Sequence, residues 1–188
     1  MFVLIETLYF ALLPVVTVAS HIFINDLTRH GHIPEGMTKN NYQYFYAYGV
    51  ILSLLLPVKN IYPFHLGRRF IETKVLKYSD RSKMNLLQFI HGLVYYTFVC
   101  MHLRDKAISN KGVFMLLNAL QSVSHYFVFI RKTAGYSHYV VEVVIYAFIY
   151  CEVGTIQMLF NLLYVLSFVL STIRNRRILR EKPRENIF

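Results

Sequence analysis

Charged residues are scarce in this 188-residue chain: Asp, Glu, Lys and Arg make up 16% of it, against roughly 25% in soluble domains. Hydrophobic residues make up 55%. They are gathered in runs that approach the 20 or so residues needed for a membrane-spanning helix. The composition therefore predicts an integral membrane protein built from α-helices.

Cysteine and glycine are too few, or too widely spaced, for several common sites. Cys100 and Cys151 both lie in apolar runs, so no disulfide framework is expected. No two of the eight glycines form G-x-G, which excludes a Rossmann turn, and neither a P-loop nor a G-x-S-x-G nucleophile elbow is present. The multiple His-rich boxes of membrane di-iron enzymes are also missing, so no metal site is predicted.

Five apolar runs predict six membrane-spanning helices. The runs are residues 1–24, 42–58, 86–103, 113–130 and 138–173. The last run is too long for one crossing, so we divide it near residues 151–154. Residues 60–75 are shorter and more polar, and they are a candidate for a seventh helix. Because no linker divides the chain, we expect one all-α membrane domain over residues 1–188, with six to seven transmembrane helices.

Positive charge is unequally distributed between the loops. With six spans, fifteen of the 20 Lys and Arg residues fall on one side, which includes the basic tail 174–188. The positive-inside rule places that side, with the C-terminus, in the cytosol. The net charge of +10 is then explained by membrane topology and anionic headgroups rather than by nucleic acid. A seventh span near residue 60 would move only the N-terminus and the first loop pair.

Polar residues inside the apolar runs are the first functional candidates, because an ionisable group is costly to bury in a bilayer. His138 and Glu142 lie one helical turn apart, which predicts a polar pocket for a ligand or cofactor. Gln121 and His125 also share a helix face, and Arg131 follows them. The alternative for both pairs is an interhelical hydrogen bond that only stabilises packing.

The segment His65 to Glu72 reads H-L-G-R-R-F-I-E. Glu72 is spaced i,i+4 from Arg68 and i,i+3 from Arg69, so we expect one of these pairs to form. The other guanidinium would then be free to bind a phosphate. The alternative is a basic loop that only sets the membrane topology.

These segments together resemble the steroid 5α-reductase family, and within it the polyprenol reductase branch. The similarity extends nearly from end to end. It comprises residues 26–31 (D-L-T-R-H-G), 42–46, 65–72 (H-x-x-R-R-x-x-E), 92–96 (G-L-V-Y-Y), 121–125 (Q-x-x-x-H) and 137–146 (E-x-x-I-Y at its end). The resemblance implies NADPH-dependent reduction of a carbon–carbon double bond in an isoprenoid lipid, in dolichol synthesis at the endoplasmic reticulum.

The resemblance also implies roles for individual residues. The cofactor site would comprise Arg68, Gln121, His125, Arg131, His138, Glu142 and Arg176. Hydride attacks the β-carbon only when a conjugated carbonyl takes up the charge, so we expect the immediate substrate to be the polyprenal. A donor must stabilise the developing oxyanion. His65 is one candidate for this donor. A nearby tyrosine, Tyr44 or Tyr46, is the other.

Two other functions remain open. A trans-2-enoyl-CoA reductase of very-long-chain fatty-acid elongation also uses an R-x-x-E-T segment, which residues 69–73 match, although G-L-V-Y-Y favours the polyprenol branch. A non-catalytic membrane protein derived from the family is the second alternative. It is favoured by the absence of the family's R-I-P-x-G loop between Lys132 and Ser137, and by Tyr44-Phe45 in place of the steroid branch's Gln-Glu pair.

Overall fold

The chain folds as a bundle of helices, and the computed structural model describes residues 2–23, 37–38, 41–56, 58–76, 83–131, 133 and 135–181, with residues 38 and 175–181 as backbone only. This part contains seven α-helices: α1 (Phe2–Phe23), α3 (Tyr42–Leu55), α4 (Tyr62–Val75), α5 (Leu86–Leu103), α6 (Lys111–His125), α7 (Ser137–Val153) and α8 (Ile156–Glu181). A π-helical turn, η2 (Tyr126–Ile130), continues α6. Strands β1 (Met37–Thr38) and β2 (Lys83–Met84) form a short antiparallel pair. The predicted all-α class is confirmed.

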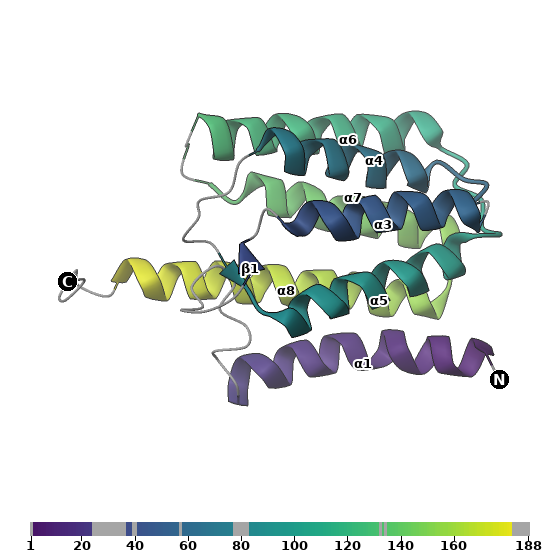
Figure 1. Cartoon of the computed structure of the whole chain (residues 1–188), viewed down its shortest axis with the longest axis horizontal. Coiled ribbons are helices and arrows are strands. Elements are labelled where there is room, and N and C mark those ends of the chain that lie inside the picture. The colour runs from purple at the N-terminus through teal and green to yellow at the C-terminus, as the bar shows by residue number, and fades with distance from the viewer. Residues whose placement is uncertain are drawn as a thin grey trace.

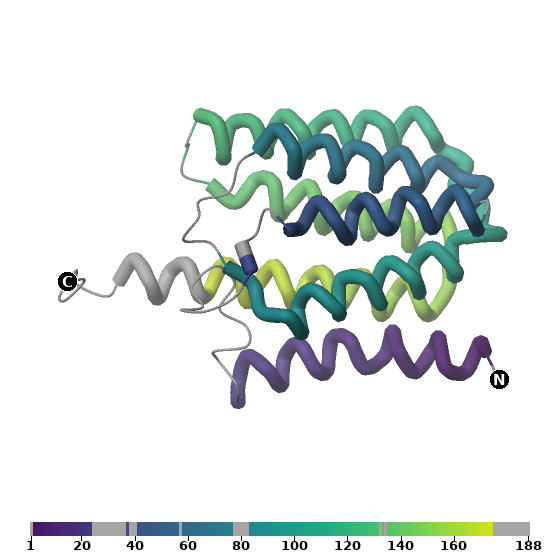
Figure 2. The backbone as a smooth tube through the Cα atoms, viewed as in Figure 1, coloured from purple at the N-terminus to yellow at the C-terminus, as the bar shows by residue number. Residues whose placement is uncertain are grey.

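Consecutive helices run in alternating directions (Figure 1). Helices α1, α4, α6 and α8 all run toward one end of the bundle, which we call the tail end, and the opposite end is the amino end. Helix α8 packs between α1 and α7, α6 packs on α7, and α3 contacts both α4 and α5. Figure 2 follows this order as a continuous trace. Because the seventh candidate near residue 60 is a helix, Phe2 and Glu181 lie at opposite ends.

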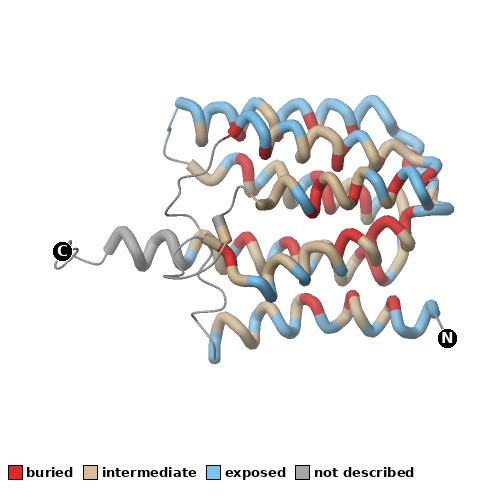
Figure 3. The backbone as a smooth tube through the Cα atoms, viewed as in Figure 1, coloured by how far each residue is buried: buried red, intermediate tan, exposed pale blue. Residues whose placement is uncertain are grey.

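Four helices are long and apolar enough to cross a membrane: α1, α5, α6 with η2, and α8 as far as Arg174. Helices α3 and α4 have 14 residues each and α7 has 17. Large apolar side chains cover the outer faces, where Val3 is 65% and Leu54 is 70% exposed. Exposed residues recur along α1 and α6, at the two edges of the bundle (Figure 3). A bilayer is the solvent that suits such a surface. The chain is a multi-pass membrane protein.

The predicted division of the last apolar run is confirmed. Helix α7 ends at Gly154, whose φ of +66° is a left-handed conformation that favours glycine. The Glu152 carboxylate, one turn before α8, accepts hydrogen bonds from the backbone N–H groups of Ser109 and Asn110 at 2.6 and 3.2 Å. It thereby holds the connection before α6 against the end of α7.

Gly92 allows α5 to approach α3 closely. A Cβ atom at this position would lie 2.9 Å from Cδ1 of Phe45, whereas one at Gly112 would meet no atom within 4 Å. We expect Gly92→Ala to lower the free energy of unfolding by about 1–2 kcal/mol, because the Phe45 ring is itself packed against other rings. Gly112→Ala is the control and should be neutral or stabilising by about 0.5–1 kcal/mol. Thermal unfolding in detergent would measure both, and equal effects would contradict the close approach.

Candidate functional site

Helix α4 brings four polar side chains to one face. Pro63 lies in its first turn, where the missing N–H costs nothing. His65, Arg68, Arg69 and Glu72 follow at spacings of three and four residues, so they line the side of α4 that faces α6. The helix is short and polar on this face, and its charged groups need partners from neighbouring helices.

Glu72 is the centre of the resulting buried cluster. Its Oε1 accepts hydrogen bonds from Arg68 Nη1 and, at 2.7 Å, from Ser122 Oγ. Its Oε2 accepts from Arg69 Nη1 at 2.8 Å and His125 Nδ1 at 2.9 Å. The expectation that one guanidinium would be left free of Glu72 was wrong, because the two carboxylate oxygens allow both ion pairs to form at once.

Helix α6 supplies the opposing face through Asn118, Gln121, Ser122 and His125. Asn118 is fully buried, and its Oδ1 accepts hydrogen bonds from Arg68 Nε and from the His65 ring, both at 2.8 Å. Gln121 is also fully buried, and its Oε1 accepts from Arg68 Nη2. Within the described part of the chain, the Gln121 Nε2 amide has no acceptor.

Helix α3 contributes Tyr46. The hydroxyl oxygen of Tyr46 accepts hydrogen bonds from Arg69 Nη2 at 2.9 Å and Nε at 3.2 Å. The guanidinium carbon lies 5.1 Å from the centre of the Tyr46 ring. Tyr46 is buried, and the described residues offer no acceptor for its hydroxyl proton.

Helix α7 adds His138 and Glu142 beside the cluster. The His138 ring is buried, with its centre 5.4 Å from the His125 ring and 5.5 Å from Phe129. Glu142 is half-buried one turn later, close enough to His125 and Tyr146 to interact electrostatically. No described residue forms a hydrogen bond or an ion pair with its carboxylate.

The remaining site residues expected from the sequence lie apart from this cluster. Tyr44 is on the outer surface of α3 and is 56% exposed. Arg131 is exposed just after η2, at the tail end. The side chain of Arg176 lies outside the described residues. The structure therefore brings together Tyr46, His65, Arg68, Gln121 and His125, with His138 and Glu142 at their side.

Sequence reasoning missed Asn118 and the contact between Tyr46 and Arg69. Asn118 had a usable signal, because it extends the polar stripe of Gln121 and His125 by one turn along α6. The Tyr46–Arg69 contact had none, because it joins two helices through side chains 23 residues apart in the sequence. Within the described ranges, no group of three or more His, Cys, Asp and Glu residues could hold a metal ion.

A second buried polar cluster lies near the amino end. His102 of α5 bonds to Glu6 of α1 through Nδ1 at 2.9 Å, and to the Thr155 hydroxyl through Nε2 at 2.8 Å. Glu6 and His102 are both buried. This cluster was not expected from the sequence, and it connects α1 to α5 and to the turn before α8.

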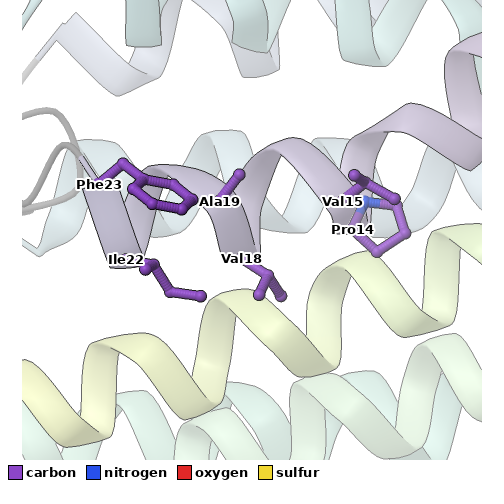
Figure 4. A pocket seen from close by; sticks show the side chains of 6 residues that line it. All are labelled: Pro14, Val15, Val18, Ala19, Ile22 and Phe23. Atoms are coloured by element: carbon purple, nitrogen blue, oxygen red, sulfur yellow. The ribbon is translucent and has the colours of Figure 1, made fainter.

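An apolar groove lies along α1 and is separate from both clusters. Figure 4 shows its lining, which comprises Pro14, Val15, Val18, Ala19, Ile22 and Phe23. These side chains offer no hydrogen-bonding group. The groove suits contact with hydrocarbon rather than with a polar ligand.

The cluster around Glu72 combines groups that can bind a polar ligand in apolar surroundings. Two guanidinium groups share the Glu72 carboxylate, so these three residues carry a net positive charge, which the Glu142 carboxylate at their side offsets. An amide donor, a phenolic proton and the Glu142 carboxylate are not used by described residues. Convergent polar groups of this kind in an apolar bundle mark a candidate binding site. No protein-family model matches the chain, and neither a curated protein nor a solved structure matches it significantly.

Proposed function

We propose that the chain is a membrane oxidoreductase that uses NADPH to reduce the α-isoprene double bond of a polyprenal, in the polyprenol-to-dolichol conversion that serves protein N-glycosylation. The observation that carries the proposal is the single buried cluster of Tyr46, His65, Arg68, Gln121 and His125. These residues come from segments that resemble the polyprenol reductase branch, and the resemblance assigns them to one pocket.

The distribution of charge supports a cytosolic tail end in the endoplasmic reticulum membrane. Thirteen of the 20 Lys and Arg residues lie at the tail end, in the segments 24–41, 76–85 and 131–136 between helices and in residues 174–188, which include the end of α8. Three lie in segments 56–61, 104–110 and 154–155, at the amino end. By the positive-inside rule, the tail end faces the cytosol. Glu72, His125 and His138 are then near the side on which a water-soluble cofactor is available.

The hydrogen-bonding and charged groups of the cluster are of the types that would bind NADPH. The buried Gln121 Nε2, which has no acceptor among the described residues, suits a carboxamide oxygen, and the Glu142 carboxylate suits an amide N–H. Arg68 and Arg69 are both paired with Glu72, so they would add only the excess positive charge of this group near a dinucleotide phosphate. His125 and His138 would complete the site, with Arg131 and Arg176 as further cations. The cofactor, when bound, supplies a hydride.

The chain's own residues would do three things in this reaction. The apolar helices around the cluster would exclude water and hold the isoprenoid tail. The Glu72 ion pairs would fix the guanidinium groups of Arg68 and Arg69. A hydrogen-bond donor would stabilise the negative charge that develops on the substrate oxygen.

Glu142→Gln is expected to weaken NADPH binding about tenfold or more, because a hydrogen bond to a charged group contributes roughly 1.5–3 kcal/mol. Calorimetric titration of the purified protein with NADPH would measure the change. Glu152→Gln is the matched control, since this carboxylate is on the same helix but at the amino end, where it binds the backbone of Ser109 and Asn110. Equal affinities for Glu142→Gln and the wild type would contradict the cofactor site.

Substrate tests would separate the three functions. The purified protein with NADPH would receive a polyprenal, a polyprenol and a trans-2-enoyl-CoA in parallel. NADPH oxidation with the polyprenal alone is the expected result, and oxidation with the enoyl-CoA alone would identify the fatty-acid elongation enzyme. Absence of both oxidation and NADPH binding would favour the non-catalytic protein. The Thr73 hydroxyl of R-x-x-E-T bonds to the Phe70 carbonyl within α4 at 2.7 Å, so it does not strengthen the enoyl-CoA alternative.

A further inference from the structure

We infer that Tyr46, held by Arg69, donates the hydrogen bond to the carbonyl oxygen of the substrate, and that Asn118 excludes His65 from this role. The inference rests on the proposed function and deepens it. It selects one of the three donor candidates, and it identifies Arg69 and Asn118 as positioning residues. Tyr44 is set aside because its side chain is exposed on the outside of the bundle.

The orientation of Asn118 is fixed by Arg68. A guanidinium Nε can only donate, so the Asn118 atom 2.8 Å from it must be the carbonyl oxygen, Oδ1. The other end of the amide agrees, because Nδ2 lies 2.8 Å from the Phe114 carbonyl, to which it donates. No alternative rotation of this side chain satisfies both contacts.

The orientation of Asn118 in turn fixes the tautomer of His65. His65 Nδ1 lies 2.8 Å from the same Asn118 oxygen, so Nδ1 must carry the proton and donate. A neutral imidazole has one N–H, which leaves Nε2 with a lone pair that cannot donate to a carbonyl. A second proton would create an imidazolium whose Nδ1 is 3.4 Å from Arg68 Nη2, in a buried site where two like charges are costly.

Tyr46 has the opposite arrangement. Its oxygen accepts two hydrogen bonds from Arg69, at 2.9 and 3.2 Å, so its lone pairs are engaged and its proton must point elsewhere. The described residues offer that proton no acceptor. Glu72 binds a third nitrogen of Arg69 at 2.8 Å and so holds the guanidinium in place.

This donor specifies an aldehyde rather than an alcohol as the substrate. As hydride from NADPH forms a new C–H bond at the β-carbon, the π bond of the alkene breaks and an electron pair moves to the carbonyl oxygen. Tyr46 donates a hydrogen bond to that oxygen, and a proton from water later adds at the α-carbon. NADPH loses two electrons and the alkene gains them. An allylic alcohol has no carbonyl to receive the electron pair.

The test measures the carbonyl group directly, without NADPH. Geranial, a short isoprenoid aldehyde, would be bound with ¹²C=O or ¹³C=O, and infrared difference spectra would give the stretching frequency of the bound carbonyl. We expect a lower frequency in the wild type than in Tyr46→Phe, which lacks only the hydroxyl. Tyr48→Phe is the matched control, because the Tyr48 hydroxyl bonds to Thr97 at 2.8 Å, and it should match the wild type.

The rate of NADPH oxidation is the second readout. In a single turnover with polyprenal, Tyr46→Phe should be roughly 10²–10³-fold slower, as for the loss of one oxyanion donor, with unchanged affinity for NADPH. An equal carbonyl frequency in Tyr46→Phe and the wild type would overturn the assignment, as would failure of geranial to bind. If the frequency depends on Tyr46 but no NADPH is oxidised, the donor assignment stands and the proposed reaction fails.

Discussion

Glu72→Gln is expected to lower the free energy of unfolding by about 3–5 kcal/mol, because Arg68 and Arg69 would remain buried without the anion that balances them. For a chain of this size, the melting temperature should fall by roughly 10 °C or more. A thiol-reactive fluorophore would report unfolding in detergent through Cys100, which is buried. The exposed Cys151 would be replaced by serine in every variant.

Ser122→Ala is the matched control for this prediction. It removes one hydrogen bond to Glu72 but no charge, so it should cost only about 1 kcal/mol. If Glu72→Gln and Ser122→Ala melt at the same temperature, the charge of Glu72 does not hold the cluster together. The proposed positions of Arg68 and Arg69 would then lose their physical basis.

Substitution of either member of the buried pair Glu6 and His102 should have the second large effect on the stability of the protein. Glu6→Leu leaves the His102 Nδ1 without its partner, and His102→Leu leaves the Glu6 carboxylate without one. We expect each substitution to lower the free energy of unfolding by about 3 kcal/mol, because a buried polar group loses its hydrogen bond. The same thermal assay with Cys100 would measure both.

The double variant tests the interaction itself. Glu6→Leu combined with His102→Leu should be closer to the wild type than the sum of the single effects, since neither partner is left unsatisfied. Thr155 loses a partner in this variant but is half-buried and can bond to water. Strict additivity of the two single effects would show that the pair does not join α1 to α5.

Helix positions could be predicted because the length of an apolar run decides whether a helix can cross a bilayer. The runs 86–103 and 113–130 correspond closely to α5 and to α6 with η2. The break before α8 was predictable because the run was too long for one span and contained Gly154. Whether residues 62–75 form a membrane helix was left open, because the polar residues on one face of this segment interrupt its apolar run. In the structure, α6 covers that face.

The candidate site was predictable only in its components. Sequence spacing placed Arg68, Arg69 and Glu72 within reach of one another, but it could not show that one carboxylate would bind both cations. The choice between His65 and Tyr46 depends on atoms that other helices place beside them, Asn118 Oδ1 and the Arg69 guanidinium respectively. Such contacts between helices have no regular spacing in the chain.

The position of the charged helix α4 has a consequence for biosynthesis. Arg68, Arg69 and Glu72 leave the ribosome before α6 supplies Asn118 and Gln121. Each charged side chain at the centre of a helix costs roughly 2.5–3.5 kcal/mol during insertion into the bilayer. On its own, α4 therefore has no favourable route into lipid. We therefore expect the entry of α4 into the bilayer to be coupled to the synthesis of α6.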